Sequence, residues 1–337
     1  MRTFSSQPHA IARLSEALFP PHPAADSAAP TRVAVCIPTL QRPLLLGALL
    51  DSLGRLRFAG TPPRVRVVVA DNDAGAQALQ TVEEARVRTG LDLEHVHVPE
   101  RNISLARNQA VQAALAWGAE WVAFVDDDEV VHPDWLQALL DAQRRWGADA
   151  VSGRVDPAYA ADAPAWVVRG GFFTRSTPPA GTPMEFPQMC NALVSARMLE
   201  DPQPFDPGYG RTGGSDALFF ARWHRAGARM VSAPDAVVEE AVHPTRARAG
   251  WILRRAFRVG NTAAAVEASL PRRQRRLGQR ALGAGLRLGW GVLALLPGVL
   301  RGRAGVVRGL WSVCFAAGFF AGVAGYRYEE YRQVHGA

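Results

Sequence analysis

From Arg32 onward, short apolar runs alternate with longer segments whose apolar residues recur at helical spacing. Residues 32–38 form a β-branched run that ends at Pro38, and residues 43–53 have helical periodicity, with Pro43 suited to the first turn. The same alternation predicts strands at residues 64–73, 93–99, 121–128, 149–155 and 235–242, and helices at residues 76–88, 103–118, 133–146 and 216–227. This order predicts an α/β fold with a mostly parallel, doubly wound sheet.

Polar residues follow four of the predicted strands. They lie at residues 38–42 (PTLQR), 71–73 (DND), 101–102 (RN) and 126–129 (DDDE). Ligands of such sheets bind beyond the carboxyl ends of the strands, so these four segments are expected to meet at one edge. Their shared position indicates a binding site more strongly than any one of them does alone.

The acidic run at residues 126–129 directly follows the apolar strand WVAFV. Asp126 and Asp128 are separated by one residue, and carboxylates in this spacing can hold one Mg²⁺ or Mn²⁺ ion, which prefer oxygen ligands. The alternative is a solvated turn that caps the helix beginning near Pro133. The D-x-D pattern alone favours the turn, but the other polar strand ends favour the metal site.

The basic residues are unevenly placed along the chain. The formal charge is +7, and all basic residues other than His are Arg. Fourteen Arg and one acid, Glu267, lie between Thr245 and Leu310, which gives that segment +13 and leaves −6 for the rest of the chain. A nucleic-acid partner is not expected, because phosphate backbones bind basic faces and this body has acids at its strand ends. The three Cys form no CxxC pair, as is typical of a reducing cytosol.

The two ends of the chain differ from its centre. Residues 1–30 lack an apolar signal-peptide core and end in a Pro/Ala-rich linker, residues 31–268 hold the α/β pattern, and residues 269–337 form an Arg-rich apolar tail. The apolar runs at 288–300 and 309–325 are each shorter than the ~20 residues that span a bilayer. The tail is therefore expected to lie on the cytoplasmic face of the inner membrane, with Arg272, Arg273, Arg275 and Arg276 facing anionic headgroups. A helical hairpin packed on the core or forming a homodimer is the alternative.

Residues 156–187 form a long segment rich in Pro, Gly and aromatic residues. A segment of this length in a compact domain is usually functional or disordered. Trp166, Phe172 and Phe173 could stack on sugar rings or pack against the sheet, and packing is expected for at least one of them.

The chain resembles the inverting glycosyltransferases of family 2, in the variant that builds bacterial polysaccharides such as succinoglycan. The resemblance covers about residues 31–268. It rests on VAVCIPTLQRPLLLGALLDSL, VVVADND, ERNISLARNQAVQAA, WVAFVDDDEVVHPDWL and FDPGYGRTGGSDALFFARWHRAGARM, in this order. It implies the glycosyltransferase A-type fold, whose Rossmann-like sheet binds a nucleotide sugar.

The resemblance also implies roles for individual residues. It assigns Pro38, Thr39, Arg42, Asp71, Asn102, Arg107, Asp126 and Asp127 to the nucleotide sugar, with Asp71 recognising the base. It assigns Asp128 and Asp126 to Mn²⁺ or Mg²⁺, with His243 or Glu240 closing the metal site. Asp216 matches the catalytic base. Two positions depart from the family pattern: Gln41 replaces Asn, and Ser215 replaces the Glu before the base.

Each of these residues also has a structural alternative. Arg42 could be a surface charge, Asp71 a turn former and Asn102 only an N-cap. Asp216 could serve only the first turn of its helix, where a carboxylate is favoured by the helix dipole. The ordinary alternative for His243 and Glu240 is a surface role.

The expected function is metal-dependent, inverting transfer of a sugar from a UDP- or GDP-sugar to an acceptor hydroxyl. The acceptor would be a saccharide or a lipid-linked molecule in cell-surface polysaccharide or glycolipid synthesis. Two other functions remain as alternatives. A sugar-nucleotidyltransferase would need a Gly-rich loop that PTLQRP lacks, and a non-enzymatic membrane- or nucleic-acid-binding protein would not explain the acids at the strand ends.

Overall fold

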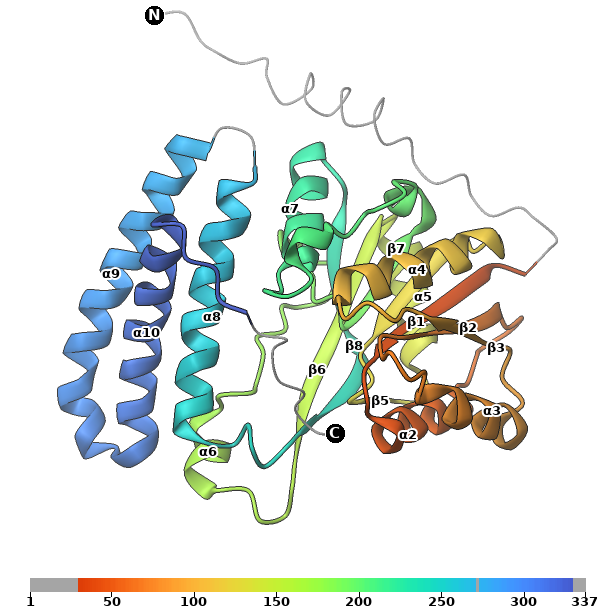
Figure 1. Cartoon of the computed structure of the whole chain (residues 1–337), viewed down its shortest axis with the longest axis horizontal. Helices are drawn as coiled ribbons and strands as arrows, with labels where there is room; N and C mark the ends of the chain where they lie inside the picture. Colours follow the sequence, from red (N-terminus) through yellow and green to blue (C-terminus); the bar gives the residue numbers. More distant parts are fainter. Residues whose placement is uncertain (1–29, 271–272, 330–337) are drawn as a thin grey trace, which may run out of the picture.

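The structure is a computed structural model that describes residues 30–270 and 273–329. The predicted N-terminal extension lies outside the described residues except for Pro30, and so do the side chains of the tail arginines at 272–276. The described chain forms an α/β body on one side and a layer of three long helices on the other (Figure 1).

One sheet of eight strands runs through the α/β body, in the order β3-β2-β1-β4-β7-β6-β8-β5. Neighbouring strands are parallel from β3 to β4 and between β6 and β8, while β7 and β5 run against their neighbours. The strands are β1 Arg32–Thr39, β2 Arg64–Asp71, β3 Leu93–His97, β4 Trp121–Val125, β5 Glu129–Val131, β6 Ala150–Tyr159, β7 Asn191–Ser195 and β8 Met230–Val242. The predicted mostly parallel sheet is confirmed, with two antiparallel strands that the sequence pattern did not indicate.

Helices cover both faces of this sheet, because alternate side chains of each strand point to opposite sides. In β1, Val33, Val35 and Ile37 pack with α2, α3 and α5, whereas Ala34 and Cys36 pack with α4 and α7. The helices are α2 Pro43–Leu53, α3 Ala78–Thr89, α4 Ile103–Ala116, α5 Trp135–Trp146, α6 Ala165–Gly170, α7 Ser215–Ala226, α8 Ala249–Ala268, α9 Arg273–Leu300 and α10 Gly302–Val323. Two short 3-10 turns lie at Ala196–Leu199 and Pro207–Tyr209.

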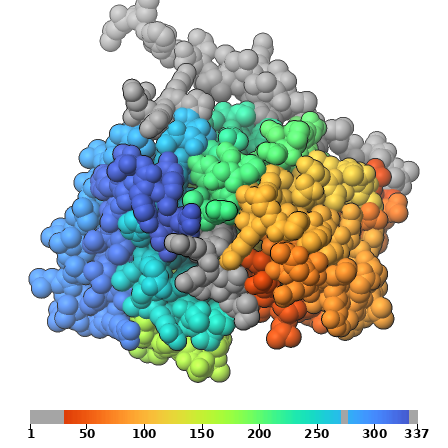
Figure 2. Space-filling view, in the orientation of Figure 1, coloured from red at the N-terminus to blue at the C-terminus, as the bar shows by residue number. Residues whose placement is uncertain are grey.

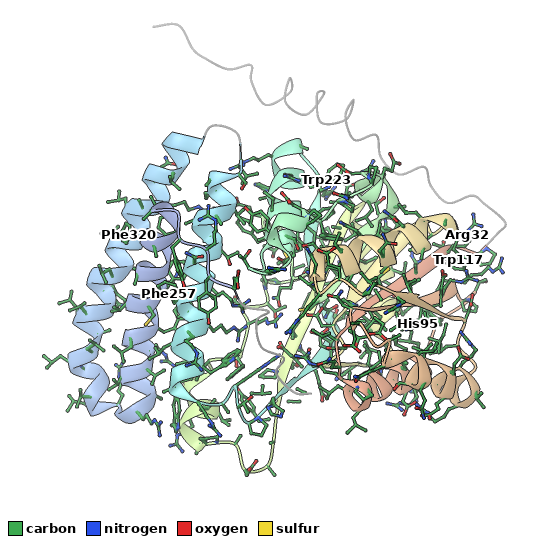
Figure 3. All side chains as sticks on the ribbon, in the orientation of Figure 1. Arg32, His95, Trp117, Trp223, Phe257 and Phe320 are labelled. Carbon is green, nitrogen blue, oxygen red and sulfur yellow. The ribbon has the colours of Figure 1, made fainter. Side chains whose placement is uncertain are left out.

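Helix α10 lies between α8 and α9 in the helical layer (Figure 1). The backbones of α8 and α10 are in direct contact: a Cβ added at Gly318 would lie 1.9 Å from the carbonyl oxygen of Phe257, and one at Gly260 would lie 2.0 Å from that of Phe315. Figure 3 labels Phe257 where these two helices meet. Asn261 on α8 also donates to the carbonyl oxygen of Gly318 at 3.2 Å. Glycine is therefore required at these crossings, as in the close helix pairs of membrane proteins.

The tail helices are longer than their apolar runs. By length and composition, residues 277–300 and 302–323 could each cross a membrane, so the expectation of two short stretches is wrong. Both helices contain arginines whose side chains pack against other parts of the protein. The Arg287 guanidinium lies 4.3 Å from the ring centre of Phe315, and Arg308 donates to the carbonyl oxygen of Gly170 on α6 at 2.8 Å. The first part of α10 is thus attached to α6 of the α/β body.

Candidate active site

A cavity of about 470 Å³ lies at the carboxyl ends of the central strands. Its walls come from the loops after β1, β2 and β4, the end of β8, the start of α7 and one face of α8. Arg32 and Trp117, labelled in Figure 3, mark the opposite end of the sheet. The cavity therefore occupies the edge where the sequence predicted a binding site.

Asp127 ties the acidic turn to the loop after β1. Its carboxylate accepts a hydrogen bond from the Thr39 hydroxyl at 2.8 Å and pairs with Arg42 at 2.7 Å. Burial raises the pKa of Asp127 to about 6, although Arg42 works in the opposite direction. Asp127 thus holds the loop in place, and Thr39 and Arg42 are fixed on the cavity wall as a result.

The two carboxylates of the D-x-D pattern both line the cavity, and each contacts arginine. Asp128 pairs with Arg42 and with Arg246, both at 3.2 Å, and Asp126 pairs with Arg107 at 3.5 Å. Burial raises the pKa of Asp126, and Arg107 opposes that shift. The solvated-turn alternative does not describe this arrangement, because the turn is enclosed and ion-paired.

The donor atoms of this turn fit a hard divalent cation. Asp126 and Asp128 offer carboxylate oxygens to one cavity, and Mg²⁺ is commonly held by one or two carboxylates together with substrate phosphates. Within residues 30–270 and 273–329, no three acidic, His or Cys side chains are grouped closely enough to hold a metal by themselves. A bound ion would therefore take its remaining ligands from outside these side chains, such as water or the phosphates of a substrate.

The predicted metal ligand His243 lies beside this turn but does not line the main cavity. It lines a second cavity, of about 330 Å³, which shares Asp128 and Arg246 with the first. Its Nδ1 lies 2.8 Å from the hydroxyl oxygen of Thr245. Glu240, the other residue considered for this role, lines the main cavity and pairs with Arg246 at 3.5 Å and with Arg175.

The residues predicted to bind the nucleotide lie in two places. Pro38, Thr39, Arg42, Asn102 and Arg107 line the cavity. The Asn102 side chain also accepts hydrogen bonds from the backbone at the start of α4, so its capping alternative is real and coexists with its position at the cavity.

Asp71 is fully buried and is not a lining residue. Its carboxylate accepts from the backbone N–H of Ala78 at 2.8 Å and lies 3.3 Å from Nε2 of His95, a residue labelled in Figure 3. Asn72, the next residue, reaches the cavity instead. In this structure Asp71 organises the loop after β2, and its contact with a base stays a prediction.

Asp216 lies in the first turn of α7 and lines the cavity. The N-cap residue is Gly214, and no side chain caps this helix. The Asp216 carboxylate makes no capping hydrogen bond, but its place in the first turn is the one that the helix-dipole alternative requires. Gly213 and Gly214 both have positive φ and turn the chain sharply into α7.

The sequence analysis missed several arginines of the site. Arg175 comes from the long segment 156–187 and pairs with Glu240, and its guanidinium lies 2.8 Å from Sγ of Cys190. The basic segment between Thr245 and Leu310 also contributes Arg246, Arg255 and Arg258 to the cavity. Arg255 and Arg258 recur with Trp251 on one face of α8, but only the fold reveals that this face lines a cavity.

The aromatic residues of the long segment pack within the protein. Phe173 stacks on Trp251 with ring centres 5.6 Å apart, and Trp166 contacts Phe172 at 5.8 Å. Arg303 lies 4.6 Å from the ring centre of Trp166. The expectation that at least one of these rings packs is confirmed, and the packing joins α6 to the helical layer.

Comparison with known proteins gives a consistent family. The sequence profile of the family described as glycosyl transferase family 2 matches residues 34–201. The succinoglycan biosynthesis protein ExoM of Rhizobium meliloti (strain 1021) is 37% identical over 235 residues, which is 68% of this chain and 72% of that protein. Most of the chain therefore has a counterpart in a protein of polysaccharide synthesis.

Solved structures give the same fold. The mannosyltransferase PcManGT of Pyrobaculum calidifontis, solved with GDP-Man and Mn²⁺, aligns with a TM-score of 0.59 at 19% identity over 94% of each chain. Residues 1–349 of S. aureus TarS, solved with UDP, align with a TM-score of 0.50 at 17% identity over 89% of this chain and 93% of that one. The fold is the glycosyltransferase A-type, and the chain belongs to glycosyl transferase family 2 as a glycosyltransferase.

Proposed function

We propose that this glycosyltransferase is metal-dependent and inverting, and that it moves a sugar from a UDP- or GDP-sugar to an acceptor hydroxyl. The proposal rests on one observation: Asp126, Asp128 and Asp216 all line the same cavity. Two of these carboxylates suit a metal ion and the diphosphate, and the third suits an attacking hydroxyl.

The wall after β1 and β4 supports the donor assignment. Arg42 and Arg107 supply cations beside Asp126 and Asp128, so a diphosphate has both guanidinium partners and metal-binding carboxylates within one site. Asn72 and Asn102 lie on the same wall and offer amide groups to a nucleoside. The relatives solved with UDP or GDP-Man have this fold, which agrees with a nucleotide-sugar donor.

Asp126 and Asp128 would hold a divalent cation, with Glu240 and His243 on nearby walls. When bound, that ion would stabilise the negative charge of the leaving diphosphate. Oδ2 of Asp128 contacts both Arg246 and Arg42, so an ion held there would either use Oδ1 or take the place of a guanidinium. Both arginines would also be positioned to pair with the phosphates of the donor.

Asp216 would act as the general base. Its carboxylate has no partner within the described residues, so its oxygens remain available to accept a proton from the acceptor hydroxyl as that hydroxyl attacks the sugar carbon. Attack from the face opposite the leaving group inverts the anomeric centre in one displacement. Glu240 suits this role less well, because both of its oxygens contact arginine.

The outer face of α9 would rest on the cytoplasmic face of the inner membrane. Leu286, Leu293 and Leu296 are 69%, 72% and 82% exposed and lie on one side of the helix. Figure 2 shows α9 at the rim of the molecule. The start of α10 contacts α6, which holds the hairpin against the α/β body. A hairpin that lies in the plane of the membrane interface agrees with this contact better than one that crosses the bilayer.

The acceptor would be a saccharide or a lipid-linked molecule used in cell-surface polysaccharide or glycolipid synthesis. The similarity to a succinoglycan biosynthesis protein supports this assignment. A membrane position would bring the cavity close to acceptors that are held at the lipid surface.

Incubation with radiolabelled UDP- and GDP-sugars, divalent metal and membrane extract tests this function. We expect label from one donor to enter an acceptor in the extract, and NMR of the product to give the inverted anomeric configuration. Transfer with retained configuration would overturn the inverting mechanism. Failure to bind or consume any nucleotide sugar would overturn the donor assignment.

A further inference from the structure

Arg255 is a half-buried cation that makes no ion pair in the described part of the chain. Its guanidinium lies 5.6 Å from the ring centre of Trp251 and 5.6 Å from that of Phe173, and it lines the main cavity. Desolvation lowers its pKa to about 10, and Glu240 only partly opposes this shift. At neutral pH the group is still charged, so the cavity contains a guanidinium that lies against two aromatic rings and makes no ion pair within the described residues.

The Arg255 guanidinium makes no hydrogen bond within the described residues, so its N–H donors are available to a ligand. A planar guanidinium can stack on aromatic faces while its donors bind an oxyanion in its own plane. The two rings are themselves stacked, with an interplanar angle of 17°, so the side chain has a firm support. The arrangement is that of an anion site, because leaving a buried cation without a counter-ion is unfavourable.

The charge of the whole cavity gives an independent reason. Among the described residues, seven arginines and five carboxylates line it, an excess of two positive charges. A divalent cation would add two charges and the diphosphate of a nucleotide sugar would remove two. The excess of two positive charges therefore persists when metal and donor are bound. Arg258 has other interactions, and if it is left out of the count the excess is still one positive charge.

Arg255 and the proposed donor wall come from different elements. Arg255 lies on α8 with Trp251, whereas Thr39 lies at the end of β1 and Arg42 in the loop after it (Figure 1). Arg246 joins the two walls, because it contacts Asp128 at 3.2 Å and lies 5.8 Å from the ring centre of Trp251. The opposite face of α8 packs against α10 through Gly260. Arg255 thus belongs to the wall between the donor site and the helical hairpin.

We propose that Arg255 binds a phosphate group of the acceptor, so that the substrate of this glycosyltransferase is a phosphorylated saccharide or lipid. This inference rests on the proposed function, because it assumes that the nucleotide sugar occupies the β1 and β4 side of the cavity. A phosphate carries about −1.5 to −2 charges near neutral pH, which matches the excess charge of the cavity.

A binding experiment on the full-length protein tests this site. The protein is first saturated with Mg²⁺ and UDP or GDP, whichever binds, and is then titrated with glucose 1-phosphate, with glucose as the uncharged control. We expect glucose 1-phosphate to bind to the nucleotide-saturated protein and glucose not to bind. Arg255→Gln should weaken this binding at least about tenfold, because a charge-assisted hydrogen bond is lost, and Arg255→Lys should restore part of it.

Arg254→Gln is the matched control, because Arg254 is exposed on the same helix. It should leave glucose 1-phosphate binding unchanged. The nucleotide affinity of Arg255→Gln should stay within about twofold of the wild type, and its melting temperature should confirm that it folds. Vesicles with and without phosphatidic acid identify the source of the phosphate. Binding that depends on both phosphatidic acid and Arg255 indicates a lipid, and vesicle binding independent of Arg255 indicates a phosphorylated saccharide.

Three results would overturn the site: no glucose 1-phosphate binding to the nucleotide-saturated wild type, equal binding by Arg255→Gln, or an equally large loss of nucleotide affinity in that variant. The last result would assign Arg255 to the donor. If the wild type binds neither UDP nor GDP with metal, the proposed function itself fails, which is a distinguishable outcome.

Discussion

Arg246 contacts the carboxylate of Asp128 at 3.2 Å, so a guanidinium occupies the group that is proposed to hold a metal ion. The same oxygen contacts Arg42. A metal ion that bound through this oxygen would compete with two intramolecular ion pairs. A nucleoside diphosphate would relieve this competition, because it offers the displaced guanidinium groups a new anion.

The first prediction concerns metal dependence. Asp128→Ala, or chelation by EDTA, should reduce sugar transfer at least about 10²-fold, because charge on the leaving diphosphate is no longer stabilised. The melting temperature should stay near the wild-type value. Asp134→Asn is a suitable control, since Asp134 is exposed and makes no capping hydrogen bond. Full activity in excess EDTA would contradict the metal assignment.

The second prediction concerns the base. Asp216→Asn keeps the shape of the side chain but cannot accept a proton, so transfer should fall by at least ~10²-fold. The variant should still bind the nucleoside diphosphate with metal and should melt near the wild type. Transfer within a few-fold of the wild type would make Asp216 structural, and Glu240→Gln would then be the next variant to test.

The third prediction concerns the membrane. Replacing Leu286 and Leu293 on α9 by Glu should move the protein from membranes to the soluble fraction without lowering its melting temperature, because both side chains are exposed. This test is sharper than truncation after Leu270, which would also expose the packed face of α8. A full-length protein that is soluble without detergent would contradict the anchor. Loss of a dimer in the double variant would instead indicate that a second copy covers α9.

The fourth prediction concerns the contact between α8 and α10. Gly318→Val should lower the free energy of unfolding by about 1–3 kcal/mol or more, because its Cβ would overlap the carbonyl oxygen of Phe257. Gly283→Ala on α9 is the control: a Cβ there meets nothing within 4 Å, and Ala is the better helix former. Denaturant unfolding of the two variants in detergent measures the difference. Equal stability would mean that the helices do not approach as described.

The fifth prediction concerns the thiols. Burial raises the pKa of Cys36 and, well above its usual value, that of Cys190, while partial burial raises the pKa of Cys314. Each thiol therefore carries less thiolate at pH 8 than a free cysteine does. Iodoacetamide at this pH should modify the native protein slowly and the denatured protein fully, as measured by mass spectrometry. Rapid labelling of native Cys190 would indicate that the cavity opens there.

The sequence predicted the strand-end half of the site better than the helical half. Thr39, Arg42 and Asp126–Asp128 follow strands whose periodicity is strong, and the topology of a parallel sheet brings such residues to one edge. The roles assigned to these residues, and the domain boundary at residue 268, stay predictions. Asp71 was placed correctly at a strand end, but its own loop takes up its carboxylate.

The helical half could not be read from local patterns. Strand β7 is short and pairs only with distant segments, so its five residues carry little periodic signal. Trp251, Arg255 and Arg258 recur on one face of α8, but a basic face can meet water, a membrane or a ligand. The choice depends on long-range packing against Phe173 and the sheet, which no local spacing records.

The glycine contacts between α8 and α10 restrict how this enzyme can diversify. Because the helix backbones touch at Gly260 and Gly318, the hairpin cannot be exchanged for an unrelated anchor as a modular part could. One face of α8 fits the hairpin and the other lines the cavity. On the proposed membrane role of the hairpin, a change in where the protein resides would have to evolve together with the wall of its active site.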